Sequence, residues 1–356
     1  MLVIDRCAVE AARVDDEIRG VTSRQDCVFD RIEANPTETL ARAAIKSATQ
    51  AGADGLVAIG GGSCIDLAKA VAAGVDPRNN LAGIMSGRSV IQGAIPLIAV
   101  PTTAGSGSQA TSFGVLYVEG RKRSLDHPSL RPAASVLDHR FVEALPSKTS
   151  AVSGLDALCQ CVESIWACRA NETSRAFAAH GGKLIFENLV AAATNHDPVA
   201  CRYIMVGSHL SGCAINISRT TAAHAYSYAL TLRHGIPHGL AVTFALGWVA
   251  RWNAGVEEVT CTHPDGPAAA RRFVEQAASV LECSPLAMET TLRRLCSELE
   301  LPPSMIDVGV RRNELQELSQ AINLQRLSNN PRRLSHADIL KCTEGLYEDL
   351  ENCKLG

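Results

Sequence analysis

The sequence is poor in aromatic residues, which make up 4% of its 356 residues, and it has no strong excess of charge of one sign. Charged residues are 20% of the chain and the formal net charge is −3 at pH 7. This balance gives no electrostatic footprint for nucleic acid or for a membrane surface. No apolar run approaches the roughly 18–20 residues of a membrane-spanning helix. The N-terminal segment lacks the basic start and cleavage site of a signal peptide, so we expect a cytoplasmic protein.

Cysteine is not scarce, but the spacing that metal or disulfide chemistry requires is missing. The 13 cysteines are an odd number, and no C-x-x-C pair occurs. The nearest pair, Cys159 and Cys161, would point to different faces of a helix. We therefore expect free thiols that pack as small apolar groups.

The hydrophobic pattern changes near residue 147. Before it, the strand-like runs "MLVI", "GLVAIGGG" and "IPLIAVP" alternate with helical stretches over residues 8–20, 37–52 and 66–75. This alternation is typical of parallel βαβ units. After it, the pattern is mostly helical. We predict an α/β, Rossmann-like nucleotide-binding domain over residues 1–146, an all-helical domain over residues 147–356, and a cleft between them.

A glycine-rich turn, "GGGS", joins a predicted strand to a predicted helix. The backbone amides of Gly61, Gly62 and Ser63 can approach a pyrophosphate there, and a helix N-terminus favours its negative charge. The pattern is neither G-x-G-x-x-G nor a P-loop. A tight turn without a ligand is the alternative, but it needs fewer glycines, so we favour phosphate binding. Asp66 and Lys69 follow, and they either orient the ligand or pair with each other.

A second loop of small residues, "PTTAGSGSQAT", follows the next strand. We expect it to form the second wall of a dinucleotide cleft through Thr102, Thr103, Ser106 and Ser108. Asp5 ends the first predicted strand, where a carboxylate can accept a hydrogen bond from an adenosine 2′-hydroxyl and repel a 2′-phosphate. An ordinary exposed loop aspartate is the alternative. The pattern therefore predicts NAD(H) or NADP(H), and Asp5 alone bears on the choice between them.

Three predicted helices carry side chains that suit a metal ion. Asp156 shares a helix face with Gln160, and His224 shares one with Tyr228. His238 begins the next element after a Gly-Ile-Pro break. One carboxylate and two imidazoles that converge from three helices make a site for Zn²⁺ or Fe²⁺ with an open coordination position. Each histidine alone is more simply a core or surface residue, so it is the joint pattern that predicts a metal.

Four motifs together resemble the iron-containing (group III) alcohol dehydrogenases: "GGGSCIDLAKAVA", "PTTAGSGS", "SGLDALCQCVES" and "TTAAHAYSYALTLRHGIPHGLAV". "NNPRRLSHADI" extends the resemblance towards the end of the chain. That family shares its fold with glycerol dehydrogenase and dehydroquinate synthase. Within it, "KRSLDHPSLRP" and "GSHLSGCAINISRTTAAHAYSYALT" resemble most the phosphonoacetaldehyde reductases of phosphonate biosynthesis. The resemblance also implies a homodimer.

The resemblance places the family's metal ligands at Asp156, Gln160, His224 and His238. The second of them is usually histidine, and a glutamine amide oxygen is a poorer ligand for Fe²⁺ or Zn²⁺. The site therefore either holds its metal through three ligands or has lost it, as in maleylacetate reductases. Tyr228 stands where the family usually carries a histidine, so we expect Tyr228 or His234 to supply the proton.

The resemblance implies reversible hydride transfer between a nicotinamide and a small aldehyde, with phosphonoacetaldehyde and 2-hydroxyethylphosphonate as one pair. The metal would polarise the aldehyde oxygen. A phosphonate needs a cationic pocket, for which Arg219 is the first candidate and Lys122 and Arg123 are the second. A solvated surface charge is the alternative for each, and Lys122 is also a candidate cofactor ligand. The rival functions are a metal-free reductase, a lyase of the dehydroquinate synthase type and a non-catalytic binding protein.

Overall fold

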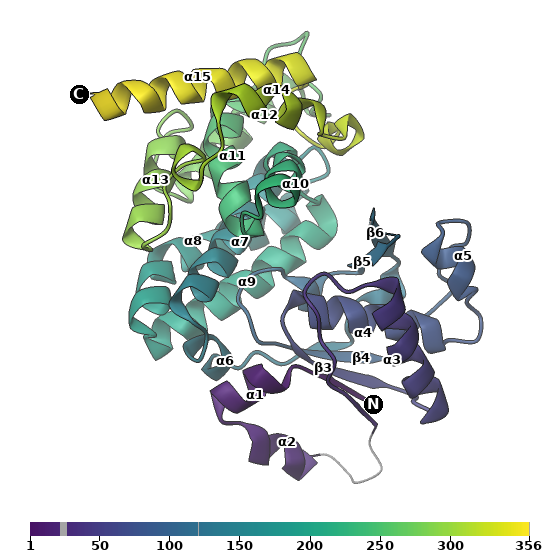
Figure 1. The fold of residues 1–356 in the computed structure, drawn as a ribbon. Coiled ribbons are helices and arrows are strands. Elements are labelled where there is room, and N and C mark those ends of the chain that lie inside the picture. Colours follow the sequence, from purple (N-terminus) through teal and green to yellow (C-terminus); the bar gives the residue numbers. More distant parts are fainter. Residues whose placement is uncertain (22–26, 120, 356) are drawn as a thin grey trace.

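The computed structural model describes residues 1–21, 27–119 and 121–355. A sheet-containing part, purple to blue in Figure 1, lies beside a helical part that runs from teal to yellow. The strands are β1 (Leu2–Ile4), β2 (Val28–Phe29), β3 (Leu56–Gly60), β4 (Leu97–Pro101), β5 (Phe113–Val118), β6 (Arg121–Asp126) and β7 (Ala134–Ser135). The helices around them are α1 (Arg6–Ala12), α2 (Asp15–Val21), α3 (Glu38–Gln50), α4 (Gly62–Val75), α5 (Leu81–Met85) and α6 (Arg140–Glu143), with the 3₁₀ helices η1 (Ser108–Ala110) and η2 (Pro128–Leu130).

The main sheet is parallel, with strand order β2-β1-β3-β4-β7. The chain runs from β1 outwards to β2 and then returns to β3 on the other side of β1. The strand order therefore reverses between β1 and β3. In doubly wound sheets the ligand binds outside the carboxyl ends of the strands at such a reversal. The "GGGS" turn follows β3 directly, so this fold places it where a nucleotide is expected.

The sheet is buried on both faces, as β1 illustrates. Leu2 and Ile4 pack in one apolar cluster with Val9 of α1 and Phe141 of α6. Val3 lies in a second cluster that includes residues of α3 and α4. Because successive strand residues point to opposite faces, a sheet covered on both sides needs an apolar residue at every position. The run "LVI" meets that need, and the predicted α/β architecture is confirmed.

The helix that the pattern predicts over residues 37–52 is present as α3. The side chain of Thr37 caps its start by accepting a hydrogen bond from the backbone N–H of Leu40. The prediction of one helix over residues 8–20 is wrong, because the stretch forms α1 and α2. Arg13 adopts a left-handed conformation (φ 56°) that ends α1. The break lets Val9 and Val14 pack in the same apolar cluster.

From α7 onwards every named element is a helix. The α-helices are α7 (Ser147–Trp166), α8 (Glu172–Asn195), α9 (Pro198–Ser218), α10 (Ala222–His234), α11 (His238–Ala254), α12 (Gly266–Ser279), α13 (Met288–Glu298), α14 (Leu315–Gln320) and α15 (His336–Leu355). The 3₁₀ helices are η3 (Ile306–Val308), η4 (Arg312–Glu314) and η5 (Leu324–Leu327). No helix among the described residues combines the length and the apolar character needed to cross a membrane.

Helix α7 forms the centre of the helical part and packs against α8, α9 and α11. Glycines keep α8 and α9 close together, since a Cβ at Gly181 or at Gly207 would lie 2.8 Å from the other residue's carbonyl oxygen. The twelve cysteines whose side chains the structure describes are all free. Cys159 and Cys161 of α7 are fully buried, which agrees with thiols that act as small core groups.

Candidate active site

A cavity of about 1020 Å³ lies where the sheet-containing part meets the helical part. Residues from the loops after β3 and β4 and from the β5–β6 hairpin form one wall. Residues from α7, α10, α11 and η5 form the other. The lining residues that sequence analysis singled out are Gly62, Ser63, Asp66, Thr103, Ser106, Ser108, Lys122, Asp156, Gln160, Arg219, His224, Tyr228 and His238. The two halves of the predicted site therefore share one space.

The glycine turn opens α4 towards this cavity. Gly61 is the N-cap residue of α4, and Gly62 and Ser63 begin the helix. A Cβ on Gly62 would lie 2.5 Å from the hydroxyl oxygen of Ser106, so only glycine lets the two loops approach this closely. Gly61 and the buried Thr102 are not among the lining residues. The exposed amides of the first turn suit an anionic group, and the helix N-terminus favours its charge.

Asp66 and Lys69 are joined through a third residue rather than paired directly. The Ser108 hydroxyl donates to Asp66 Oδ1 at 2.5 Å, and Lys69 Nζ donates to Ser108 Oγ at 2.9 Å. Lys69 also donates to Thr111 Oγ1 and to the carbonyl oxygen of Phe113. Burial lowers the pKa of Lys69 to about 8 and raises that of Asp66. Lys69 thus holds the second loop against α4, while Asp66 lines the cavity.

Asp5 lies at the carboxyl end of β1, next to the glycine turn. Its backbone N–H donates to the carbonyl oxygen of Ile59 at 2.8 Å. Its side chain caps α1 by accepting from the backbone N–H of Ala8 at 3.3 Å. It is not among the residues that line the cavity. The contact with an adenosine ribose stays a prediction.

Asp156 of α7, His224 of α10 and His238 at the start of α11 bring their ligand-type atoms within 4.8 Å of one another. Asp156 Oδ1 is 3.3 Å from His224 Nε2 and 3.8 Å from His238 Nε2. These two atoms, Asp156 Oδ1 and His224 Nε2, are buried and have no hydrogen bond of good geometry to any described residue. Buried polar atoms need a partner, and a carboxylate oxygen with imidazole nitrogens is a common ligand set for a divalent cation. The three residues therefore fit a metal ion.

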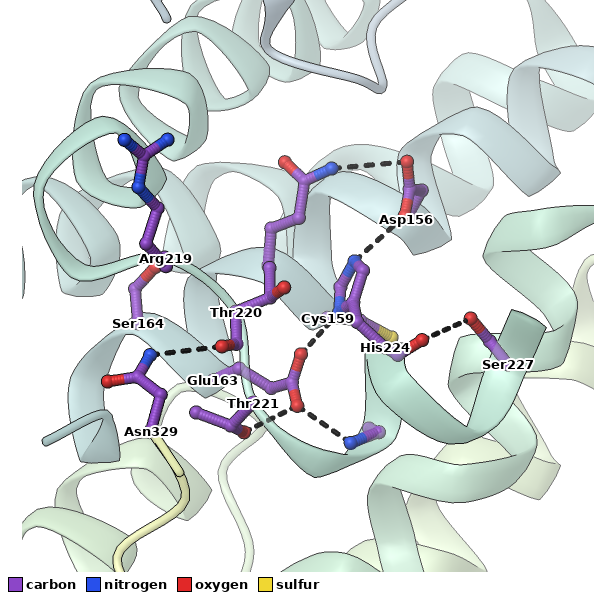
Figure 2. Close-up of polar contacts among 12 residues, drawn as sticks. Asp156, Cys159, Glu163, Ser164, Arg219, Thr220, Thr221, His224, Ser227 and Asn329 are labelled. Atoms are coloured by element: carbon purple, nitrogen blue, oxygen red, sulfur yellow. Dashed lines mark hydrogen bonds and ion pairs between the residues drawn. The ribbon is translucent and has the colours of Figure 1, made fainter. Parts of the chain in front are cut away.

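Glu163 of α7 supports the metal site and was not predicted from the sequence. Its Oε2 accepts a hydrogen bond from His224 Nδ1, on the side of the imidazole opposite Asp156 (Figure 2). Its Oε1 accepts from the Thr221 hydroxyl at 2.5 Å and from the backbone N–H of Ala223 at 2.8 Å. The carboxylate thereby fixes the tautomer that points Nε2 at the metal site. The signal was available, since Glu163 lies two helical turns after Asp156 on one face.

The pKa values of the two imidazoles are shifted in opposite directions. Burial lowers the pKa of His224, but Glu163 and Asp156 outweigh it and raise that pKa to about 10. Burial lowers the pKa of His238 to about 4, with only partial compensation by Asp156. His238 is therefore neutral at pH 7, with a lone pair free to bind a cation. A cation between Asp156 and His224 would take the place of the proton that His224 otherwise holds.

Gln160 contacts Asp156 through its amide nitrogen. Nε2 donates to Asp156 Oδ2 at 3.1 Å, and Oε1 accepts from the Ser211 hydroxyl at 2.6 Å. An ionised carboxylate only accepts hydrogen bonds, so the amide NH₂ group faces it. The amide oxygen is consequently engaged by Ser211. This geometry favours three ligands, and a fourth ligand from Gln160 stays a prediction.

Tyr228 lies beside the three residues that suit a metal, and two cationic side chains lie near its ring. Its ring stacks on that of His238, with centroids 5.5 Å apart and an interplanar angle of 18°. Lys122 Nζ is 3.9 Å from the centre of the Tyr228 ring, and Arg326 Cζ is 4.8 Å from it. Arg326 was not predicted, because no spacing rule connects η5 to α10. Arg123 is not among the residues that line the cavity.

His234 and Arg219, which were also predicted to act in the site, differ in whether they line the cavity. His234 ends α10, has Nε2 4.0 Å from Glu314 Oε1 and is not among the residues that line the cavity. Arg219 does line it, but an Nη2 contact of 2.7 Å pairs it with Asp126. Its guanidinium also lies over the Phe113 ring, 4.3 Å from the centre. Tyr228 is therefore the better placed proton donor of the two that were predicted.

Comparisons with known proteins agree with this site. Residues 1–139 match the iron-containing alcohol dehydrogenase family, and residues 150–347 match the C-terminal region of the Fe-containing alcohol dehydrogenase family. Phosphonoacetaldehyde reductase of Streptomyces viridochromogenes is 33% identical over 314 residues, which are 85% of this chain and 78% of that protein. 4-Hydroxybutyrate dehydrogenase of Cupriavidus necator is 28% identical over 355 residues, 97% of this chain and 91% of that one.

Solved structures show the same relationship. The crystal structure of sulfoacetaldehyde reductase from Bifidobacterium kashiwanohense in complex with NAD⁺ matches with a TM-score of 0.83 and 27% identity, over 96% of this chain and 88% of that one. The chain belongs to the iron-containing alcohol dehydrogenase family. It is a nicotinamide-dependent oxidoreductase, and its residues Asp156, His224 and His238 suit a divalent metal.

Proposed function

We propose that this protein reduces a short aldehyde that carries an anionic group, with phosphonoacetaldehyde as the first candidate, to the corresponding alcohol. The observation that carries the proposal is that Asp156, His224 and His238, the three residues that suit a metal ion, line the same cavity as several cationic side chains. The names of two relatives support it, because phosphonoacetaldehyde and sulfoacetaldehyde are both two-carbon aldehydes with an anionic end.

The residues that line the cavity have separate roles in binding the cofactor and the metal. The amides of Gly62 and Ser63 at the start of α4 hold the cofactor pyrophosphate, and Lys122 faces the cofactor from the hairpin. Thr103, Ser106 and Ser108, from the loop after β4, line the same wall. Asp156, His224 and His238 would hold a divalent cation, which would supply polarisation of the aldehyde oxygen. The reduced nicotinamide, when bound, would supply the hydride for the aldehyde carbon.

Tyr228 provides the proton that completes the alcohol. Burial raises the pKa of Tyr228, but Lys122, His224 and Arg326 together lower it below its usual value. A hydroxyl with a lowered pKa transfers its proton more readily near neutral pH. The sum of the reaction is one aldehyde, one NADH and one proton converted to one alcohol and one NAD⁺.

The experiment is a metal analysis of protein purified with and without air, followed by NADH and NADPH oxidation with phosphonoacetaldehyde and with neutral aldehydes. Metal-dependent turnover that favours phosphonoacetaldehyde is the expected result. Turnover without metal would assign the protein to the metal-free reductases and overturn the role of the cation. If the folded protein oxidises neither cofactor with any aldehyde, the proposal is wrong. A lyase of the dehydroquinate synthase type or a non-catalytic binding protein then becomes the better hypothesis.

Two further expectations belong to the same proposal. The position of Asp5 beside the glycine turn favours NADH over NADPH, since a carboxylate would repel a 2′-phosphate. A homodimer is expected from the family resemblance, and the cytoplasm is the expected location. Cofactor titration and light scattering in solution test the first and the second of these expectations.

A further inference from the structure

We propose that Arg326 and Lys122, which both contact the Tyr228 ring, form the subsite that binds the anionic end of the substrate. This inference rests on the proposed function and names the groups that give it its selectivity. The two residues come from η5 and β6, which the fold brings together at α10. Both line the cavity that holds the metal-type residues.

The charges that line the cavity favour an anion at this place. The charged lining residues are Lys122, Lys148, Arg169, Arg219 and Arg326 on the cationic side and Asp66, Asp126 and Asp156 on the acidic side. Asp126 pairs with Arg219, and Asp66 accepts from Ser108. Within the described ranges no carboxylate lies within 4.0 Å of the charged nitrogens of Lys122 or Arg326. Cations that line a cavity and are not neutralised by nearby carboxylates attract anionic ligands, even where one of them, Arg326, is exposed.

The position beside the metal site limits the length of the substrate. Tyr228 stacks on His238, and Lys122 and Arg326 lie 3.9 and 4.8 Å from the centre of the same ring. His238, Lys122 and Arg326 therefore all lie around one aromatic ring. An aldehyde whose oxygen faces His238 can reach the cations only with an anionic group a few bonds away. Two-carbon aldehydes satisfy this condition.

The chemistry of the two cations suits a tetrahedral oxyanion. A guanidinium presents two parallel N–H donors that match two oxygens of a phosphonate or a sulfonate. An ammonium adds a compact point charge without directional demands. Arg219, the candidate from sequence, is less suited because Asp126 already neutralises its guanidinium. Arg326 and Lys122, which have no carboxylate partner among the described residues, are therefore better suited to the subsite.

The test replaces Arg326 alone, because Lys122 is also assigned to the cofactor. It compares KM values, since any effect of Arg326 on the Tyr228 proton would change kcat for both aldehydes. Arg326→Gln removes the charge and keeps a polar side chain. We expect the KM for phosphonoacetaldehyde to rise about 10- to 100-fold, as the loss of a charge-assisted hydrogen bond implies. The KM for propionaldehyde should stay within about twofold, because this substrate has no anionic end. Arg326→Lys should recover part of the loss.

Arg294→Ala is the matched control, since Arg294 lies on α13 and pairs with Glu298, 3.6 Å away, outside the cavity. Equal KM changes for both aldehydes in Arg326→Gln, or no change for either, would overturn the subsite while leaving the reductase function in place. Absence of NADH oxidation by the unmodified protein would instead overturn the function.

A binding measurement tests the subsite without turnover. Calorimetry with 2-hydroxyethylphosphonate and with 2-hydroxyethylsulfonate, in the presence of NAD⁺, should show binding to the unmodified protein that Arg326→Gln weakens about tenfold or more. The tighter of the two probes identifies the preferred anion. Binding of neither probe, or binding that Arg326→Gln leaves unchanged, would overturn the assignment.

Discussion

The carboxylate of Glu163 and the imidazole of His224 form a buried hydrogen-bonded pair behind the metal site (Figure 2). Nδ1 of the imidazole is committed to Glu163, so Nε2 is the nitrogen that faces Asp156, 3.3 Å from its Oδ1. Both residues of the α7 face, Asp156 and Glu163, thus act on one histidine from opposite sides. The pair orients a metal-type ligand before any cation is bound.

Replacing Glu163 by glutamine should weaken metal binding. The amide oxygen can still accept from His224, but the amide NH₂ group would face the N–H of Ala223, which is itself a donor. We expect metal affinity to fall about 10- to 100-fold, the usual cost of losing such a partner. Competition with a chromophoric chelator measures it. Glu187→Gln, at an exposed ion pair with Lys183 on α8, is the matched control, and equal affinity in both variants would contradict the role.

Replacing Gln160 by histidine should strengthen metal binding. An imidazole at this position points from the same face of α7 as Asp156 and offers a better ligand than an amide. We expect affinity to rise about tenfold or more, with a change in the visible spectrum of the Co²⁺-loaded protein as a nitrogen ligand is added. Ser211→Ala, which only frees the amide oxygen of Gln160, should leave that spectrum close to its original form. An unchanged spectrum in Gln160→His would show that the position does not face the metal.

The sequence predicted well wherever a local rule was sufficient. The strand after Met1, the capped helix after Thr37 and the glycine turn follow from periodicity and end signals, and the structure contains all three. The grouping of Asp156 with two histidines followed from their joint pattern, and the structure brings the three together.

Features that depend on tertiary packing could not be predicted in this way. The break at Arg13 accompanies the packing of Val9 and Val14 in one apolar cluster against the sheet, which no local pattern indicates. Arg326 meets Tyr228 although the two are 98 positions apart in the sequence, and no periodicity relates their two segments. His234 shows the converse, since its place in a histidine-rich motif suggested a role that its position at the end of α10 does not favour.

Adding one methyl group at Gly62 should weaken cofactor binding. The Cβ of Gly62→Ala would lie 2.5 Å from Ser106 Oγ, so the second loop must move away from α4. We expect the NADH dissociation constant to rise about tenfold, because the first helical turn loses its close approach to the pyrophosphate. Fluorescence titration measures it. Gly55→Ala is the control, since its Cβ meets only the Pro96 carbonyl oxygen at 3.7 Å, an ordinary contact. Equal constants in the two variants would remove Gly62 from the cofactor site.

Glu289 of α13 should make the stability of the helical part depend on pH. Its carboxylate lies against Gly247 of α11, and burial raises its pKa from 4.5 to about 7, although Arg293 and Arg251 offset part of the effect. The folded protein therefore holds this proton more tightly than the unfolded chain. The resulting stabilisation is fully present below pH 4.5 and is lost as the pH rises through about 7.

Glu289→Gln keeps the neutral form at every pH and so removes this dependence. We expect the variant to match the original protein near pH 4.5 and to exceed its free energy of unfolding at pH 8 by about 1–3 kcal/mol. Urea unfolding of chelator-treated protein at the two pH values measures it without a contribution from bound metal. Glu298→Gln, a half-exposed residue of the same helix, should leave the difference between the two pH values unchanged. A gain from Glu289→Gln that is equal at both pH values would mean that packing, rather than the buried proton, sets its effect.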